Sequence, residues 1–213
     1  MGGDWYKTRV LPTGQVLIAL GDARGHGLDA VTLMAKLRYA LAGLAFTGEP
    51  VERLTAWLNS VACDDGDEST ATAVIAHYHP DHGLLRWTCA GHPPPVLVRG
   101  RRACPLDPPG GPGLPLGVLT GESYVAAETS LDPGDVVLLY SDGLIERRGS
   151  DPDRDLARLV RAAESYARDG IPPGDEALDA YVRDLVRHLT GPHPEDDSTV
   201  LAFRLRGGED GGR

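Results

Sequence analysis

The glycine-rich stretch from Ala19 to Gly27 places a carboxylate between a strand and a helix. It ends an apolar run, Gln15 to Leu20, that predicts a buried strand, and it leads into a helical pattern that begins at Leu28. Asp22 lies where the strand meets this turn, so its carboxylate can point into open space. The glycines beside it let the backbone approach a ligand that a side chain would block. The same pattern also fits a plain turn, so other segments must decide between the two.

Length and composition are those of one globular domain. The chain has 213 residues, 41% hydrophobic and 24% charged, which is enough for one sizeable core and short for two. The net charge is −10, and basic residues form only short patches such as 99–102. Nucleic-acid binding is therefore disfavoured, because phosphate neutralisation needs a basic surface.

Cysteine usage and hydropathy exclude further classes. The three cysteines have no CxxC spacing, so neither a disulfide framework nor a structural zinc site is expected. No secretory signal precedes the first motif, and no apolar run reaches the roughly 20 residues of a membrane-spanning helix. We therefore expect a cytoplasmic protein with no membrane partner.

Hydrophobic periodicity predicts strands and helices along the whole chain. A strand over Trp5–Val10 turns into the strand that ends near Asp22, so Asp4 and Asp22 are expected side by side in an antiparallel hairpin. Further strands are expected over 70–78, 84–90, 96–98, 136–140 and 199–205, and helices over 28–46, 51–61, 153–168 and 175–189. The first helix is expected to bury the stripe Leu28, Val31, Met34, Leu37, Leu41 and Leu44. Segment 104–117, rich in proline and glycine, is expected to be an ordered loop or a mobile flap.

Two clusters of metal-ligand residue types are interpreted as solvated surface. The acidic run 64–68 lacks the ligand spacing of an EF-hand. His77, His79 and His82 lie on and beside a predicted hairpin with only Asp81 at ligand spacing, which favours a solvated hairpin face.

Four carboxylates stand at strand boundaries, three of them next to glycine: Asp4, Asp22, Asp142 and Asp196 or Asp197. If these strands share one edge, the carboxylates converge and repel, and hard divalent cations such as Mg²⁺ or Mn²⁺ relieve that repulsion. Two such ions can lower the pKa of a water and clamp a phosphate. Four independent turn aspartates are the alternative, and the pattern alone leaves both open.

Six motifs in order carry a resemblance to a known family. They are Gly2–Tyr6, Gly21–Gly27, Ala90–Pro95, Leu114–Gly117, Pro133–Asp135 with Tyr140–Glu146, and Asp196–Thr199. The chain thereby resembles the PPM, or PP2C-type, metal-dependent serine/threonine phosphatases, in particular their bacterial SpoIIE/RsbU-like branch. The motifs cover nearly the whole chain up to Leu205.

The resemblance implies the fold and the domain limits. It implies an α+β fold, an αββα four-layer sandwich of two antiparallel sheets flanked by helices, over 1–206, with a disordered tail at 207–213. The family domain carries a further strand before its first glycine-rich motif, and this chain is expected to lack it.

The resemblance also implies a site for two Mn²⁺ or Mg²⁺ ions. Its implied ligands are the bridging Asp22, the backbone carbonyl of Ala23, Asp142 with Asp196 (Asp197 being the alternative), and Asp4 directly or through water. Asp22, Asp142 and Asp196 then activate the attacking water, so no Ser or Cys nucleophile is needed. His26 is interpreted as support near the metals and His92 as a loop-fixing residue.

The implied reaction is hydrolysis of phosphoserine or phosphothreonine on a STAS-type anti-sigma-factor antagonist, in partner-switching control of transcription. The region 28–62 matches a regulatory switch of this branch, which suggests an upstream sensor domain or a homodimer. Arg24 stands where smaller residues are common, and either contacts phosphate or is merely exposed. A non-catalytic binding module and a hydrolase of small phosphorylated molecules stay open as alternatives.

Overall fold

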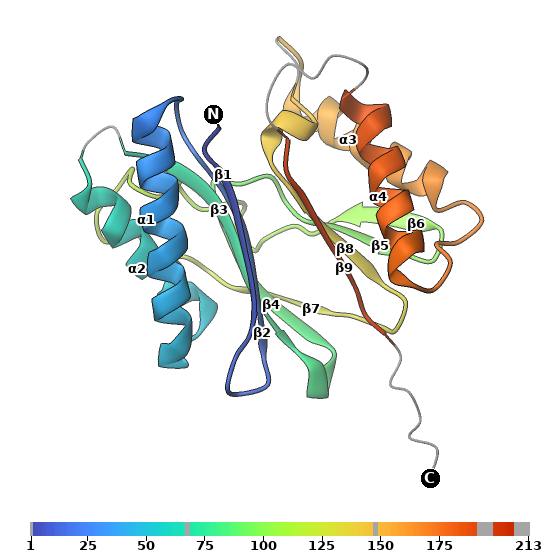
Figure 1. Cartoon of the computed structure of the whole chain (residues 1–213), viewed down its shortest axis with the longest axis horizontal. Helices are drawn as coiled ribbons and strands as arrows, with labels where there is room; N and C mark the ends of the chain where they lie inside the picture. Colours follow the sequence, from blue (N-terminus) through green and yellow to red (C-terminus); the bar gives the residue numbers. More distant parts are fainter. Residues whose placement is uncertain (1, 67–68, 147–148, 191–197, 207–213) are drawn as a thin grey trace.

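Two antiparallel sheets lie face to face, and each is covered on its outer side by two helices (Figure 1). This computed structural model describes residues 2–66, 69–146, 149–190 and 198–206. The α+β, αββα four-layer sandwich expected from the sequence is confirmed. The expected tail at 207–213 lies outside the described residues.

The first sheet has the strand order β1-β2-β3-β4-β7 and the second the order β6-β5-β8-β9. The first sheet consists of β1 (Asp4–Val10), β2 (Val16–Ala23), β3 (Ala71–His79), β4 (Leu84–Ala90) and β7 (Ala127–Ser130). The second consists of β5 (Val96–Arg99), β6 (Arg102–Pro105), β8 (Val136–Tyr140) and β9 (Val200–Arg204). The covering helices are α1 (Leu28–Leu44) and α2 (Val51–Asp64) on the first sheet, and α3 (Pro152–Tyr166) and α4 (Asp175–Thr190) on the second.

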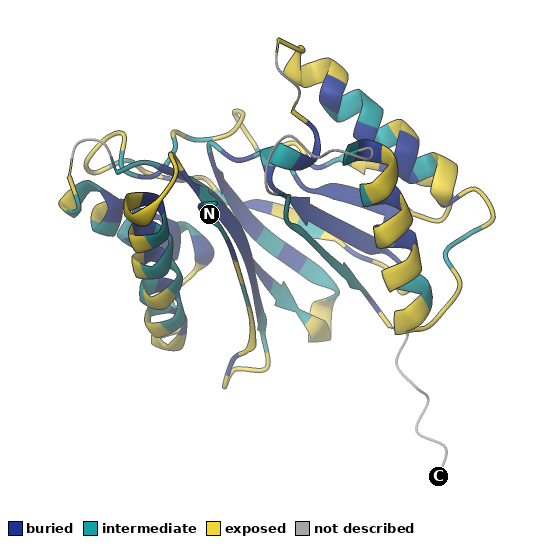
Figure 2. Ribbon diagram, turned by 45° about the horizontal axis from the view of Figure 1, so that its top comes forward, coloured by how far each residue is buried: buried dark blue, intermediate teal, exposed yellow. Residues whose placement is uncertain are grey.

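Three apolar layers separate these elements, and strand parity decides which layer each side chain enters. In β2, Leu17 and Ala19 pack toward α1 and α2, whereas Ile18 and Leu20 pack between the two sheets. A third layer lies between the second sheet and α3 and α4. Strands β2, β3, β4, β5 and β8 are mostly buried, β1 is mostly exposed or half-buried, and the outer faces of the helices are exposed (Figure 2). Asp22 follows the parity of Leu20 and therefore faces the other sheet.

Helix α1 buries the predicted stripe only in part: Leu37 and Leu41 are buried, and Met34 and Leu44 pack against the same core. Its buried residues are Ala30, Leu33, Leu37 and Leu41, whereas Leu28 is 78% exposed. The predicted stripe was therefore wrong at its start. Leu28 is the first residue of the helix, directly after the turn at Gly27, and the face that packs against the sheet begins only at Ala30. The remaining stripe repeats every three or four residues, as expected for a helix that covers a sheet.

One helical stretch is long and apolar enough to span a membrane, contrary to the expectation from the sequence. Within the part of the chain that the structure describes, Leu28–Thr47 is 20 residues long and passes by length and composition as a membrane-spanning candidate. Leu33, Leu37 and Leu41 of this stretch lie in the apolar layer against the first sheet. Packing against the first sheet thus explains these three leucines.

Two short strands were not predicted. Strand β6 overlaps the start of the expected loop 104–117 and buries only Ala103, and β7 buries only Ala127. Both are edge strands, formed by pairing with β5 and β4 respectively. Strands of four residues with one buried side chain leave almost no alternating pattern in a sequence.

The prediction of a solvated histidine face was wrong for His77. Its side chain is only 4% exposed, because β3 lies between β2 and β4, where His77 faces Leu17 and Arg86 across the sheet. Burial, helped by the charge of His79 and opposed by that of Glu52, lowers the pKa of His77 to about 4. The Nε2 atom of His77 is buried without a hydrogen-bond partner among the described residues.

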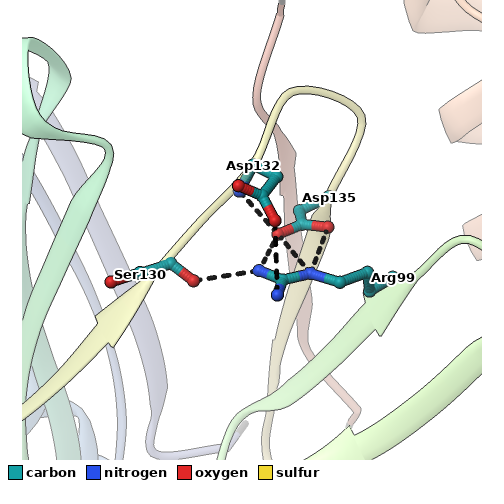
Figure 3. Close-up of polar contacts among 4 residues, drawn as sticks. All are labelled: Arg99, Ser130, Asp132 and Asp135. Carbon is teal, nitrogen blue, oxygen red and sulfur yellow. Dashed lines mark hydrogen bonds and ion pairs between the residues drawn. The ribbon is translucent and has the colours of Figure 1, made fainter.

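A polar cluster joins the two sheets at the turn before β8 (Figure 3). The Arg99 guanidinium, on β5, donates from Nε and Nη2 to the carboxylate of Asp135, at 2.6 to 3.1 Å, and from Nη2 to the backbone oxygen of Ser130 on β7, at 2.9 Å. Asp132 adds an ion pair at 3.3 Å and donates its backbone N–H to Asp135. The Pro133–Asp135 motif is thus structural: a nearly buried carboxylate holds the start of β8.

Candidate metal centre

Asp4 and Asp22 face each other across the first hairpin, as predicted. They are register partners at the start of β1 and near the end of β2. Their neighbours Trp5 and Ala23 pack in the layer beneath α1 and α2. Because strand side chains alternate, both carboxylates lie on the face that looks toward the second sheet. Two acids therefore share one end of the layer between the sheets.

The second sheet reaches this pair through Ser141, which directly follows β8. The Ser141 hydroxyl donates to Asp4 Oδ2 at 2.7 Å and accepts the backbone N–H of Thr199 at 2.9 Å. The backbone N–H of Ser141 donates to the carbonyl of Thr199 at 2.9 Å. Ser141 thus ties the ends of β8, β9 and β1 together. The sequence analysis missed this residue, and its only signal was the place before Asp142 at a strand end.

Asp142 opens a 3-10 turn, Asp142–Leu144, at the same end of the sandwich as the start of β1 (Figure 1). Its carboxylate accepts the backbone N–H of Gly143 at 2.8 Å, and its carbonyl accepts the N–H groups of Ile145 and Glu146, each at 2.8 Å. Burial raises the pKa of the Glu146 carboxyl, and the charges of Asp142 and Asp155 raise it further. The turn is therefore held by the backbone in an electronegative setting.

Gly3 leaves room for oxygen atoms of the next strand. Its carbonyl accepts the backbone N–H of Ala23 at 3.1 Å. A Cβ on Gly3 would stand 2.0 Å from the Ala23 carbonyl oxygen and 2.7 Å from Asp22 Oδ1. Such distances are sterically forbidden. Only glycine fits beside these two oxygens.

The donor set at this end fits hard divalent cations. Carboxylates of Asp4, Asp22 and Asp142, together with the Ala23 carbonyl, are the oxygen ligands that Mg²⁺ and Mn²⁺ prefer. Asp196 and Asp197 lie outside the described residues. Within the described ranges, no three His, Cys, Asp or Glu side chains are grouped closely enough to hold a metal ion. The ligand set as a whole therefore remains a prediction.

His92 connects the two sheets next to these carboxylates. Its Nε2 lies 3.1 Å from the Tyr140 carbonyl and its Nδ1 2.8 Å from the Thr72 hydroxyl. A carbonyl only accepts, so Nε2 carries the proton and Nδ1 accepts from Thr72. Thr72 is the register partner of Asp22, and burial lowers the pKa of His92 to about 4. His92 therefore bridges the two sheets, which is a more specific role than the loop-fixing one interpreted from the sequence.

His26 and Arg24 lie on the turn between β2 and α1, and both are exposed. The backbone N–H of Arg24 donates to the carbonyl of Thr70 at 2.9 Å, which holds this turn against the start of β3. The His26 ring forms no hydrogen bond with any described residue, so its support role stays a prediction. Both residues line a cavity of about 800 Å³.

Comparison of the coordinates with solved structures defines the class of fold. The RsbU and RsbW domains of a Mycobacterium tuberculosis protein match with a TM-score of 0.84 and 29% identity, over 97% of this chain and 56% of that one. The PP2C phosphatase domain of SpoIIE from Bacillus subtilis, solved with a fragment of its regulatory domain, matches with a TM-score of 0.75 and 21% identity, over 96% and 58%. The fold is that of PP2C phosphatase domains.

Sequence comparison then gives the family. The model of the stage II sporulation protein E (SpoIIE) family matches residues 12–206, and the chain belongs to this family. It is 30% identical to the phosphoserine phosphatase RsbU of Bacillus subtilis over 207 residues, which is 97% of this chain. The chain spans 60% of the length of that relative. The SpoIIE/RsbU-like, PP2C-type resemblance expected from the six motifs is confirmed.

Proposed function

We propose that this chain is a metal-dependent protein serine/threonine phosphatase that hydrolyses phosphoserine or phosphothreonine on a protein substrate. The observation that carries the proposal is the Asp4–Asp22 pair, which faces the second sheet and is joined to the Asp142 turn through Ser141. The carboxylates of Asp4 and Asp22, on β1 and β2, and that of Asp142, on the turn after β8, thus lie at the same end of the sandwich. No Ser or Cys nucleophile is needed for this chemistry.

The proposed ligands of two Mn²⁺ or Mg²⁺ ions are Asp22 as the bridge, the Ala23 carbonyl, Asp142 and Asp196, with Asp4 direct or through water. Asp197 is the alternative to Asp196. When bound, such ions supply a water of lowered pKa and neutralise the charge of the phosphate. The carboxylates at this end of the sandwich supply the negative charge that retains the ions.

The chain's own residues orient these ligands. Ser141 holds one oxygen of Asp4, and the Gly143 N–H holds one oxygen of Asp142, so neither carboxylate rotates freely. Gly3 keeps the Ala23 carbonyl uncovered. His92 fixes the spacing between the sheets on which the ligands stand. Ligands held in this way lose little conformational entropy when ions bind.

The proposed substrate is a phosphorylated STAS-type anti-sigma-factor antagonist, which places the chain in partner-switching control of a sigma factor in the cytoplasm. The name of RsbU, a phosphoserine phosphatase, and the pairing of RsbU and RsbW domains in the mycobacterial protein support this assignment. An upstream sensor domain or a homodimer acting through the region 28–62 belongs to the same proposal.

The test measures hydrolysis of p-nitrophenyl phosphate with Mn²⁺, Mg²⁺ or EDTA, for the intact chain and for Asp22→Asn and Asp142→Asn. Asp81→Asn, an exposed aspartate on the turn between β3 and β4, is the matched control. We expect turnover that needs metal, is lost in both site variants and persists in the control. Calorimetric titration with Mn²⁺ follows ion binding independently of turnover.

Three results would refute the proposal. Metal-independent turnover would exclude the two-ion site. A folded chain that binds Mn²⁺ and a STAS-type protein but hydrolyses neither p-nitrophenyl phosphate nor phosphoserine would indicate a binding module. Faster turnover of a nucleotide than of any phosphoprotein would move the substrate to small phosphorylated molecules.

A further inference from the structure

The cavity beside the proposed metal centre lies between the β2–α1 turn, the first turns of α1 and residues 69–70. Its volume is about 800 Å³, and its polar lining includes Arg24, His26, Asp29, Lys36 and Asp65. Cavities of this size hold small ligands or several side chains of a bound peptide.

Arg24 is a cation of this cavity that has no ion-pair partner among the residues that the structure describes. The Lys36 ammonium forms an ion pair with the Asp65 carboxylate across the cavity. The Arg24 guanidinium forms no hydrogen bond or ion pair within the described ranges, and it is exposed. Asp29 lies in the first turn of α1, where a carboxylate is stabilised by the helix N-terminus. A guanidinium in this position is free to bind a carboxylate or a phosphate with two parallel hydrogen bonds.

The cavity lies within a few residues' reach of the site of hydrolysis. Arg24 is two residues from Asp22, so their Cα atoms are at most about 7 Å apart. An extended peptide advances about 3.3 Å per residue. A substrate whose phosphoserine lies at Asp22 can therefore place a side chain one to three residues away next to Arg24.

Resting on the proposed function, we infer that this cavity is a substrate subsite in which Arg24 binds an acidic side chain flanking the phosphoserine. The chain carries a net charge of −10, so an acidic substrate meets repulsion from most of the surface. The Arg24 guanidinium beside the reaction site then sets the orientation and register of the peptide. Its contribution belongs to binding and not to the chemical step.

The experiment compares phosphoserine peptides that differ only at the flanking positions, with Glu, Ala or Lys one to three residues from the phosphoserine. Each peptide is incubated with the 213-residue chain and Mn²⁺, and KM and kcat for its hydrolysis are measured separately. For the unaltered chain we expect KM for the Glu-flanked peptide roughly three- to fivefold below that for the Ala-flanked one, the size of an exposed ion pair, with equal kcat.

Three variants and one control distinguish binding in the cavity from the electrostatic field of the whole protein as the cause of the preference for Glu. Arg24→Ala is expected to abolish the preference for Glu, Arg24→Glu to reverse it toward Lys, and Asp29→Asn to increase it. Arg101→Ala removes an exposed arginine on the turn between β5 and β6 and is expected to keep the preference. Raising the salt concentration should reduce the preference in the unaltered chain.

The inference is overturned if Arg24→Ala keeps the Glu preference, if Arg101→Ala loses it equally, or if the unaltered chain hydrolyses all peptides alike. Each of these results leaves the phosphatase proposal intact. Absence of metal-dependent turnover of both p-nitrophenyl phosphate and the peptides would instead remove the proposed function, and the inference with it.

Discussion

Acidification from about pH 7.5 to 5.5 should destabilise this protein through His77. Its pKa is lowered to about 4 in the folded state by burial, whereas an unfolded histidine titrates near 6.5. Below pH 6.5 the unfolded chain therefore binds a proton that the folded chain does not. The stability that His77 provides is complete above pH 6.5 and is lost as the pH falls toward 4.

The expected loss follows from these two pKa values. At pH 5.5 the unfolded histidine is about nine-tenths protonated, and the folded one is almost neutral. The unfolding free energy contributed by this residue then falls by about 1.4 kcal/mol, one pKa unit's worth. His92, whose pKa burial also lowers to about 4, should contribute a similar loss. Together they predict a decrease of about 3 kcal/mol.

Urea unfolding at the two pH values measures this decrease. His77→Phe, which keeps an aromatic ring in the buried position, should remove about half of the pH dependence. His82→Gln is the matched control, because His82 is exposed on the turn after β3 and should leave the pH dependence unchanged. An unaltered pH dependence in His77→Phe, with the same m-value, would refute the assignment of the proton to His77.

Three further substitutions test how the site and the sheets are held. Ser141→Ala removes the hydroxyl bond to Asp4 and should cost about 2 kcal/mol of unfolding free energy and weaken Mn²⁺ binding, measured by urea unfolding and calorimetry with exposed Ser60→Ala as the control. Gly3→Ala should lower Mn²⁺ affinity at least tenfold, since the added Cβ collides with the Ala23 carbonyl oxygen. Unchanged affinity would contradict a role of that carbonyl as a metal ligand. Arg99→Ala leaves a buried carboxylate unpaired and should cost about 2 kcal/mol, with Arg99→Lys restoring part of it.

Much of the fold was readable because its elements are long and periodic. Strands β2, β3 and β8 are near-continuous apolar runs, and α3 begins after Asp151, whose side chain accepts the N–H groups of Asp153 and Arg154. Strands β6 and β7 were missed, since each has four residues and one buried side chain. Their existence depends on a neighbouring strand that no local window contains.

Part of the candidate site was also predictable from the sequence, and part was not. The Asp4–Asp22 pair followed from hairpin geometry, since an antiparallel register needs only the turn length. The role of Ser141 did not follow, because its partner Asp4 is 137 residues away in the sequence. His92 likewise gains its bridging role only when Thr72 and Tyr140 arrive from opposite sheets.

Local residue patterns are enough to establish the order of the longer strands and helices, the glycine-flanked carboxylates and membership of the SpoIIE family. These properties are local patterns, or sums of local patterns, in residue type and spacing. Three properties appear only when the sheets pack: His77 is buried, Asp135 holds Arg99, and Arg24 lines a cavity with no ion-pair partner among the described residues. Burial and pairing depend on which distant surfaces meet, and that is settled when the two sheets pack.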